Sequence, residues 1–169
     1  ADIAHEHHIP LVVDSTFTPP ALYRPMEDGA DIVIHSLSKW IGGHGAAMGG
    51  VVIDSGKFDW KASNVPLFTE PDANYHGLRW AQDLPAELAP IAFALRFRTV
   101  PLRNLGACLS PDNAWIFLIG CETLHVRMER HSQNGLAAAK FLKNHPEVAW
   151  VRYPGLEEDP AYPVAKKQL

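Results

Sequence analysis

The chain has 169 residues, of which 47% are hydrophobic and 20% charged, and its formal net charge is -4. This composition is typical of a folded globular protein with one sizeable core, and it excludes a disordered chain. The weak negative charge gives no electrostatic reason to expect binding to nucleic acid or to an anionic membrane surface. No apolar run approaches the roughly 20 residues needed to span a bilayer.

The first residues, ADIAHEHHIP, lack the basic-then-apolar order of a signal peptide. The two cysteines, Cys108 and Cys121, have no C-x-x-C spacing and no dense pattern that would indicate a disulfide framework. We therefore expect reduced thiols and a cytoplasmic protein.

The first third of the chain predicts an α/β fold. Residues 1–10 have the pattern of the last turns of a helix. LVVD (11–14) and DIVIHS (31–36) are short, β-branched and continuously apolar, as expected of central parallel strands covered on both faces. Residues 19–30 between them are predicted to form a loop with at most a short helix, and MGGVVIDSG (48–56) is predicted to be a third strand.

The rest of the chain is predicted to be mainly helical. Residues 57–84 indicate a loop with short helical pieces, and residues 87–109 have the apolar period of one helix. Residues 110–146 predict one long helix or two consecutive ones, with Ser110 as N-cap and Pro111 at the first helical position. VAWVRYPG (148–155) is typical of a strand, and the chain ends on a helix that is just starting. We expect a segment of a larger protein that lacks sequence at both ends.

Several familiar motifs fail on inspection. A zinc-protease H-E-x-x-H would need a histidine at position 9, which is Ile9. Gly50 and Gly56 are one residue too far apart for a phosphate loop, and the dinucleotide fingerprint G-x-G-x-x-G is absent. His5 and His8 could share a helix face, but a solvated helix end is favoured. No metal site is predicted.

The strongest chemical pattern joins Asp14 to the segment HSLSK (35–39). Both follow predicted parallel strands, and ligands bind beyond the carboxyl ends of such strands. A lysine held there, partly desolvated, can act as an amine nucleophile toward an aldehyde, and an aspartate can pair with a protonated pyridine nitrogen. Ser36 and Ser38 can donate to a phosphate, and the glycines from Gly42 to Gly50 let the backbone pass close to a flat ligand. These are the groups that pyridoxal 5'-phosphate (PLP) needs.

The segments VVDSTFTPP, GADIVIHSLSKWIGGHGAAMGGVVIDSG, SPDNAWIFLIGCETLHVRMERH and VRYPGL resemble, in this order, the Cys/Met-metabolism family of PLP enzymes. The insert PLFTEPDANYHGLRWAQDLP, followed by AFALRFRTVPLRNLGACLSP, is similar to that of the O-acetylhomoserine sulfhydrylases. The resemblance implies PLP-dependent transferase fold type I, which is aspartate aminotransferase-like. Residues 1–145 would be part of the large, mainly parallel-sheet PLP domain, and residues 146–169 the start of the C-terminal domain.

The resemblance also implies residue roles. Lys39 matches the Schiff-base lysine, Asp14 the acid that pairs with the pyridine nitrogen, Ser36 and Ser38 the phosphate-binding hydroxyls, and Thr16 a residue close to the ring. The implied reaction is γ-replacement, which converts O-acetyl-L-homoserine and sulfide to L-homocysteine and acetate in methionine biosynthesis. Two alternatives stay open: cystathionine γ-synthase or methionine γ-lyase of the same family, and a non-catalytic binding or assembly remnant.

Other parts of the family's site have no counterpart in this sequence. These are a glycine-containing phosphate turn, an aromatic that stacks on the ring, an arm that reaches the neighbouring subunit, and the arginine that binds the substrate carboxylate. The isolated chain is therefore expected to be inactive or nearly so. The full-length protein is expected to be a homo-oligomer, a dimer or tetramer. For His44, His76 and Arg79, ordinary loop structure is favoured over contact with substrate or a neighbouring subunit.

Overall fold

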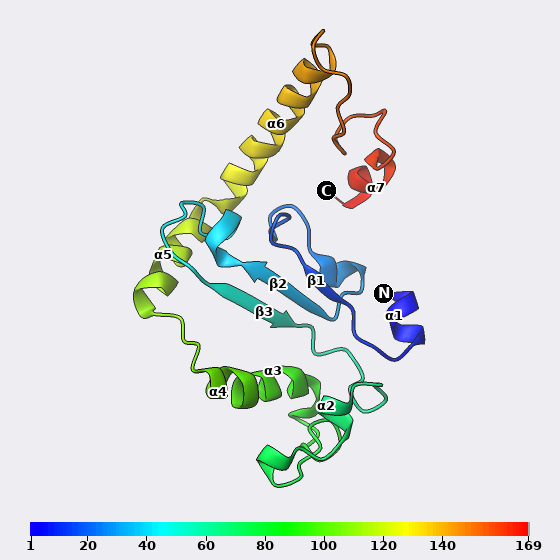
Figure 1. Cartoon of the computed structure of the whole chain (residues 1–169), viewed down its shortest axis with the longest axis vertical. Coiled ribbons are helices and arrows are strands. Elements are labelled where there is room, and N and C mark those ends of the chain that lie inside the picture. Colours follow the sequence, from blue (N-terminus) through cyan, green and yellow to red (C-terminus); the bar gives the residue numbers. More distant parts are fainter. Residues whose placement is uncertain (169) are drawn as a thin grey trace.

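A three-stranded sheet organises the computed structural model, which describes residues 1–168 (Figure 1). The strands are β1 (Val12–Asp14), β2 (Ile32–Ser36) and β3 (Gly50–Asp54), in the order β1-β2-β3. β1 and β2 are parallel, and β3 is antiparallel to β2. The predicted parallel pair and the predicted third strand are confirmed.

The two parallel strands differ in how much of their surface is covered. In β2, Ile32 and Val33 each expose only 2% of their surface, whereas Val12 in β1 exposes 48%. Coverage on both faces was predicted for both strands, and for β1 this is wrong. The chain between β1 and β2 forms a loop and one 3-10 turn, Pro25–Asp28, instead of a helix long enough to cover the edge strand.

The N-terminal helix, α1 (Asp2–Glu6), is attached to the start of β2. Asp31 is buried, and its Oδ2 accepts hydrogen bonds from His5 Nε2 at 2.7 Å and from the backbone N–H of Leu11 at 2.8 Å. A buried carboxylate is stable only when it is paired and hydrogen-bonded in this way. His5, for which a solvated helix end was favoured, therefore makes a hydrogen bond to a buried residue.

A layer of short helices lies below β3 in Figure 1: α2 (Pro66–Thr69), α3 (Ala92–Phe97) and α4 (Arg103–Leu105). The loop with short helical pieces predicted for residues 57–84 is confirmed. The helix predicted for residues 87–109 is shorter at both ends and not uniform: a 3-10 turn (Ala89–Ile91), α3, a π-helical turn (Arg98–Leu102) and α4 follow one another without a break. Pro101 lies inside the π-helical turn, and a proline cannot donate the hydrogen bond that a regular helix needs there.

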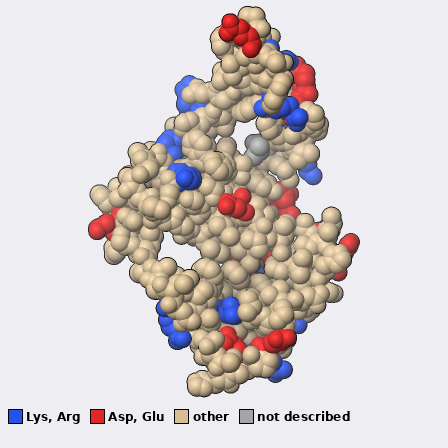
Figure 2. Space-filling model, viewed as in Figure 1, with Lys and Arg blue, Asp and Glu red and all other residues tan. Residues whose placement is uncertain are grey.

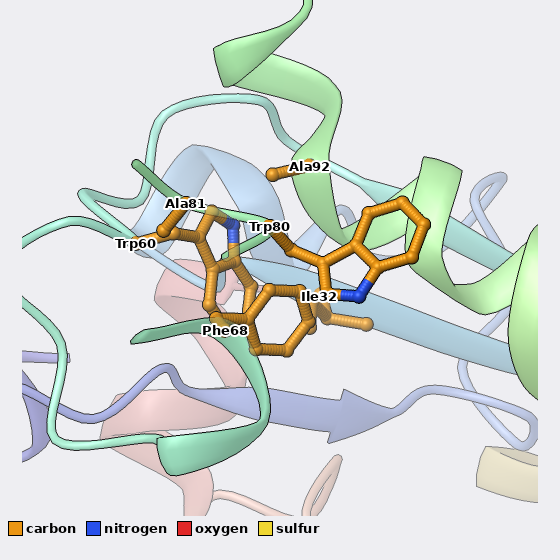
Figure 3. Packing of buried hydrophobic residues seen from close by; sticks show 6 residues of the cluster. All are labelled: Ile32, Trp60, Phe68, Trp80, Ala81 and Ala92. Carbon is orange, nitrogen blue, oxygen red and sulfur yellow. The ribbon is translucent and has the colours of Figure 1, made fainter. Parts of the chain in front are cut away.

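An aromatic core holds this loop-rich region together (Figure 3). Ring centroids of Trp60 and Phe68 lie 4.1 Å apart, and Phe93 stacks on Trp60 at 5.7 Å. Burial of each such side chain contributes on the order of 1.5–3 kcal/mol. Aromatic packing therefore replaces long regular helices as the source of order here. The buried members of the cluster are Ile32, Trp60, Phe68, Trp80, Ala81 and Ala92.

Two consecutive helices follow, α5 (Pro111–Glu122) and α6 (Leu124–Lys143). The Ser110 hydroxyl accepts from the N–H of Asn113 at 3.1 Å, and Pro111 occupies the first helical position. The predicted cap and the two-helix alternative are confirmed. α6 runs away from the sheet (Figure 1), and α7 (Tyr162–Gln168) ends beside the Pro25–Asp28 turn, where Gln168 Nε2 donates to Asp28 at 3.2 Å.

The strand predicted at residues 148–155 is wrong. This segment has no regular structure and wraps around the buried Asp159. The Asp159 carboxylate accepts from Arg152 Nε at 2.9 Å and from the N–H groups of Tyr153 and Ala161 at 3.0 and 2.9 Å. Because a carboxylate takes the N–H of Tyr153, that group is not available for a strand ladder.

The surface carries both signs of charge. Lys, Arg, Asp and Glu side chains are scattered over the face seen in Figure 2, without a concentrated basic patch. In the described part of the chain, every helix is too short or too polar to cross a lipid bilayer.

Candidate functional site at the strand ends

The carboxyl ends of β1 and β2 meet at one edge of the sheet. Asp14 pairs with Ile34 in the parallel register, and the N–H of Ser15 donates to the carbonyl of Ile34 at 2.9 Å. Beyond the strands, the N–H of Ser36 donates to Thr16 Oγ1 at 2.8 Å. This hydrogen bond directly joins the two predicted parts of the site, although Thr16 and Ser36 are 20 residues apart in the sequence.

Asp14 is an exposed carboxylate that stays ionised. Its Oδ1 accepts from the N–H of Thr16 at 3.0 Å. Hydrogen bonding from the Thr16 side chain, then from the Thr16 backbone, lowers the pKa of Asp14, and the nearby His35 acts in the same direction; desolvation opposes them but is outweighed. An ionised carboxylate is the form needed to pair with a protonated ring nitrogen.

Thr16 is 8% exposed, and its side chain contacts other residues of the protein instead of solvent. Its hydroxyl accepts from Ser36 N–H and lowers the pKa of Asp14, so it joins the two strand ends. This role was not foreseen from the sequence, in which Thr16 was only expected to lie close to the cofactor ring.

His35 is a further residue that the sequence reasoning missed. It is 2% exposed, and its Nδ1 donates to the carbonyl of Ser15 at 2.9 Å. The carbonyl can only accept, which assigns the proton to Nδ1. The available signal was a histidine inside an otherwise apolar strand, a position where a polar side chain needs a partner.

Lys39 follows β2 in a π-helical turn, Leu37–Ile41, with a non-helical backbone (φ -91°, ψ -123°) at the lysine itself. The Lys39 side chain is exposed in this chain, so the desolvation expected for it is not present among the described residues. Ser36 and Ser38 are half-buried. Ser38 Oγ accepts from the N–H of Gly49 at 3.1 Å, which ties the turn to the start of β3.

Two glycines of the Gly42–Gly50 segment have a packing role. A Cβ at Gly49 would lie 2.6 Å from the Phe117 ring, and one at Gly42 would lie 2.9 Å from it. These glycines thus admit Phe117 of α5, which is 4% exposed. The sequence reasoning assigned the glycines to a close approach of a ligand, and it did not foresee this contact with a helix about 70 residues later.

The three residues for which loop structure was favoured make local contacts. His44 Nδ1 donates to the carbonyl of Gly42 at 2.7 Å, and Arg79 binds Asp83 at 2.7 Å. His76 ends a 3-10 turn in the left-handed conformation, with φ at 56°. Loop structure accounts for each of them.

The residues at this edge fit the PLP expected from the sequence. Asp14 is ionised for a pyridine nitrogen, and Ser38 keeps its hydroxyl proton to donate because its Oγ acts as an acceptor toward Gly49. Among the described residues, no carboxylate forms an ion pair with Lys39.

Two cavities of the chain lie elsewhere. One of about 790 Å³ lies between β3 and the α3–α4 region, and one of about 480 Å³ lies beside His5 and Asp31. Neither is lined by Asp14 or Lys39. The strand-end site is therefore an open edge in this chain, and enclosing a ligand there requires further protein surface.

The family model described as "Cys/Met metabolism PLP-dependent enzyme" matches residues 1–169. An O-acetyl-L-homoserine sulfhydrylase of Leptospira meyeri is 49% identical over 98% of this chain and 38% of its own length. A homocysteine synthase of Schizosaccharomyces pombe is 48% identical over 100% of this chain and 39% of its own length. The chain thus spans about two fifths of the length of these curated relatives.

Solved structures give the same result. A protein of Campylobacter jejuni assigned as an O-acetylhomoserine (thiol)-lyase, which carries an N'-pyridoxyl-lysine-5'-monophosphate, superposes with a TM-score of 0.88 at 40% identity, covering 99% of this chain and 41% of that one. The O-acetylhomoserine sulfhydrylase of Wolinella succinogenes gives 0.79 at 38% identity, covering 99% and 44%.

Proposed function

The chain belongs to the Cys/Met metabolism PLP-dependent enzyme family, and we propose that the full-length protein is an O-acetylhomoserine sulfhydrylase. Family membership, fold type I and PLP as the cofactor were predicted, and all three are confirmed. The proposed reaction is γ-replacement, in which O-acetyl-L-homoserine and sulfide give L-homocysteine and acetate. The names of the relatives, O-acetyl-L-homoserine sulfhydrylase and homocysteine synthase, support this choice.

Each site residue has a proposed task. Lys39 would hold the cofactor by its aldehyde group, Asp14 would pair with the ring nitrogen, and Ser36 and Ser38 would donate to the phosphate. When bound, PLP supplies an electron sink that stabilises negative charge at the substrate Cα. Lys39 Nζ would then act as the base that removes the Cα proton and later returns a proton to the substrate.

The connected ends of β1 and β2 carry this proposal. The lowered pKa of Asp14 keeps this acid ionised at one edge of the sheet. The Ser36–Thr16 hydrogen bond attaches the segment that carries Lys39 to the same edge. We further propose a domain division after residue 145 and a cytoplasmic homo-oligomer. The division is supported by residues 144–161, which follow α6 without helix or strand.

Replacement of Lys39 tests the proposal. In the full-length protein, Lys39→Ala is expected to abolish the visible absorbance of bound PLP and to lower turnover of O-acetylhomoserine with sulfide by about 10²–10⁴-fold, the usual contribution of a positioned base. The exposed Lys61 gives a matched control, since Lys61→Ala removes one ammonium group away from the strand ends.

The results separate the alternatives. Retention of both absorbance and turnover in Lys39→Ala contradicts the assignment of Lys39. Wild-type turnover of cystathionine or methionine, but not of O-acetylhomoserine, would replace the sulfhydrylase with another member of the family. A full-length protein that binds no PLP would support the non-catalytic alternative.

A further inference from the structure

Arg127, on α6, reaches across to the backbone that directly follows Lys39. Its Nη1 donates to the carbonyl of Trp40 at 2.8 Å, and its Nη2 donates to the carbonyl of Ile41 at 3.3 Å. Nη2 also donates to the carbonyl of Gly120 in α5 at 2.8 Å, and Nε to Thr123 Oγ1 at 3.1 Å. One guanidinium therefore connects α5, the α5–α6 junction and the lysine turn.

The carbonyl groups around Lys39 explain why this contact matters. The turn's own N–H groups pair with two carbonyls: Gly42 N–H donates to Leu37, and Gly43 N–H donates to Lys39, each at 2.8 Å. The carbonyls of Trp40 and Ile41, which lie between, receive their donors from Arg127 instead. A polar backbone group without a partner is costly, so the turn depends on this distant side chain for its conformation.

The fit around the guanidinium is close. A Cβ at Gly43 would lie 2.7 Å from the Arg127 guanidinium, so this glycine admits the arginine to the turn. Arginine suits the position because its planar group presents several donors in a fixed arrangement, which the single ammonium of lysine does not reproduce. The non-helical backbone at Lys39 lies directly before the carbonyls that Arg127 holds.

We propose that Arg127 is a positioning residue for Lys39: by holding the Trp40 and Ile41 carbonyls, it sets the backbone from which the lysine amine reaches the cofactor. This inference rests on the proposed role of Lys39. Arg127 touches neither substrate nor cofactor in this scheme, and it acts only through the turn.

The test measures PLP binding by the full-length protein. Apoenzyme of the wild type, Arg127→Met, Arg127→Lys and Arg130→Met is titrated with PLP, and the visible absorbance and the dissociation constant are recorded. Arg130 is an exposed arginine of the same helix, so its variant controls for loss of charge and for altered α6 propensity. Arg127→Met is expected to raise the dissociation constant about tenfold, equivalent to about 1.4 kcal/mol, and to lower kcat more than it raises KM.

A purely structural role would lower the melting temperature but leave the absorbance band, PLP affinity and kcat of the folded protein as in Arg130→Met, and this result overturns the proposal. If Arg127→Met does not fold, Arg127→Lys decides: weakened PLP binding supports the proposal, and wild-type binding contradicts it. Lys39→Ala in the same titration separates the proposed role of Lys39 from the proposed role of Arg127. If Lys39→Ala retains the absorbance band of bound PLP, the role of Lys39 is contradicted. If Lys39→Ala loses the band but the Arg127 variants bind PLP like the wild type, only the role of Arg127 is contradicted.

Discussion

The closest backbone approach near the lysine turn occurs at Gly120, and a single methyl group there should disturb both helix packing and the site. In Gly120→Ala, the new Cβ would lie 2.5 Å from the carbonyl oxygens of Ile41 and Gly42. Ordinary contact begins at about 3.4 Å. Both neighbours are backbone atoms, so the strain cannot be relieved by rotating a side chain.

Two opposing effects set the magnitude. Overpacking of this kind costs about 1–3 kcal/mol, whereas alanine in place of glycine inside a helix gains up to about 1 kcal/mol. Displacement of α5 also weakens the hydrogen bond from Arg127 to the Gly120 carbonyl, which is 2.8 Å long in the native structure. We therefore expect a net loss of about 1–2 kcal/mol in the free energy of unfolding.

Urea unfolding of the full-length protein, compared at one protein concentration, measures this loss. Gly135→Ala in α6 is the matched control, because the three atoms nearest to its Cβ all belong to the Tyr153 side chain, with the hydroxyl at 3.0 Å, and no backbone atom is among them. The control should be neutral or stabilised by up to about 1 kcal/mol. A Gly120→Ala protein as stable as the Gly135→Ala protein would refute the packing argument.

Two further predictions concern polar contacts. Thr16→Val removes the acceptor of the Ser36 N–H, so it should lower the free energy of unfolding by about 1–3 kcal/mol and raise the pKa of Asp14. Thr16→Ser retains the hydroxyl and should keep the native stability and the lowered pKa of Asp14. Equal stability of the two variants in urea would contradict the role given to the hydroxyl. The Arg152 guanidinium, followed by backbone N–H groups, lowers the pKa of Asp159 below its ordinary 3.8. This stabilisation is present above that ordinary value and is lost as the pH falls through the lower folded pKa. Unfolding midpoints measured from about pH 6 to pH 2 should thus fall more steeply in the wild type than in Asp159→Asn, and parallel curves would speak against the prediction.

The local patterns of the sequence were sufficient for the parts of the fold that depend on neighbouring residues. β-branched runs predicted the strands, and Ser110 with Pro111 predicted the start of α5. Asp14 and the lysine segment could be assigned to one sheet edge because parallel strands align their carboxyl ends. The family could also be recognised from several segments that occur in a fixed order along the chain, because they include the lysine, acid and hydroxyl residues that the cofactor chemistry requires.

Long-range contacts decided the rest. The link from Thr16 to Ser36, the packing of Phe117 on Gly42 and Gly49, and the reach of Arg127 to the lysine turn join residues 20 to 87 positions apart. The failed strand at residues 148–155 has a more local cause, because the N–H of Tyr153 donates to Asp159, six residues later, instead of to another strand. A residue's own sequence neighbourhood indicates which hydrogen bonds it can make, and only the folded chain determines which partner lies within reach.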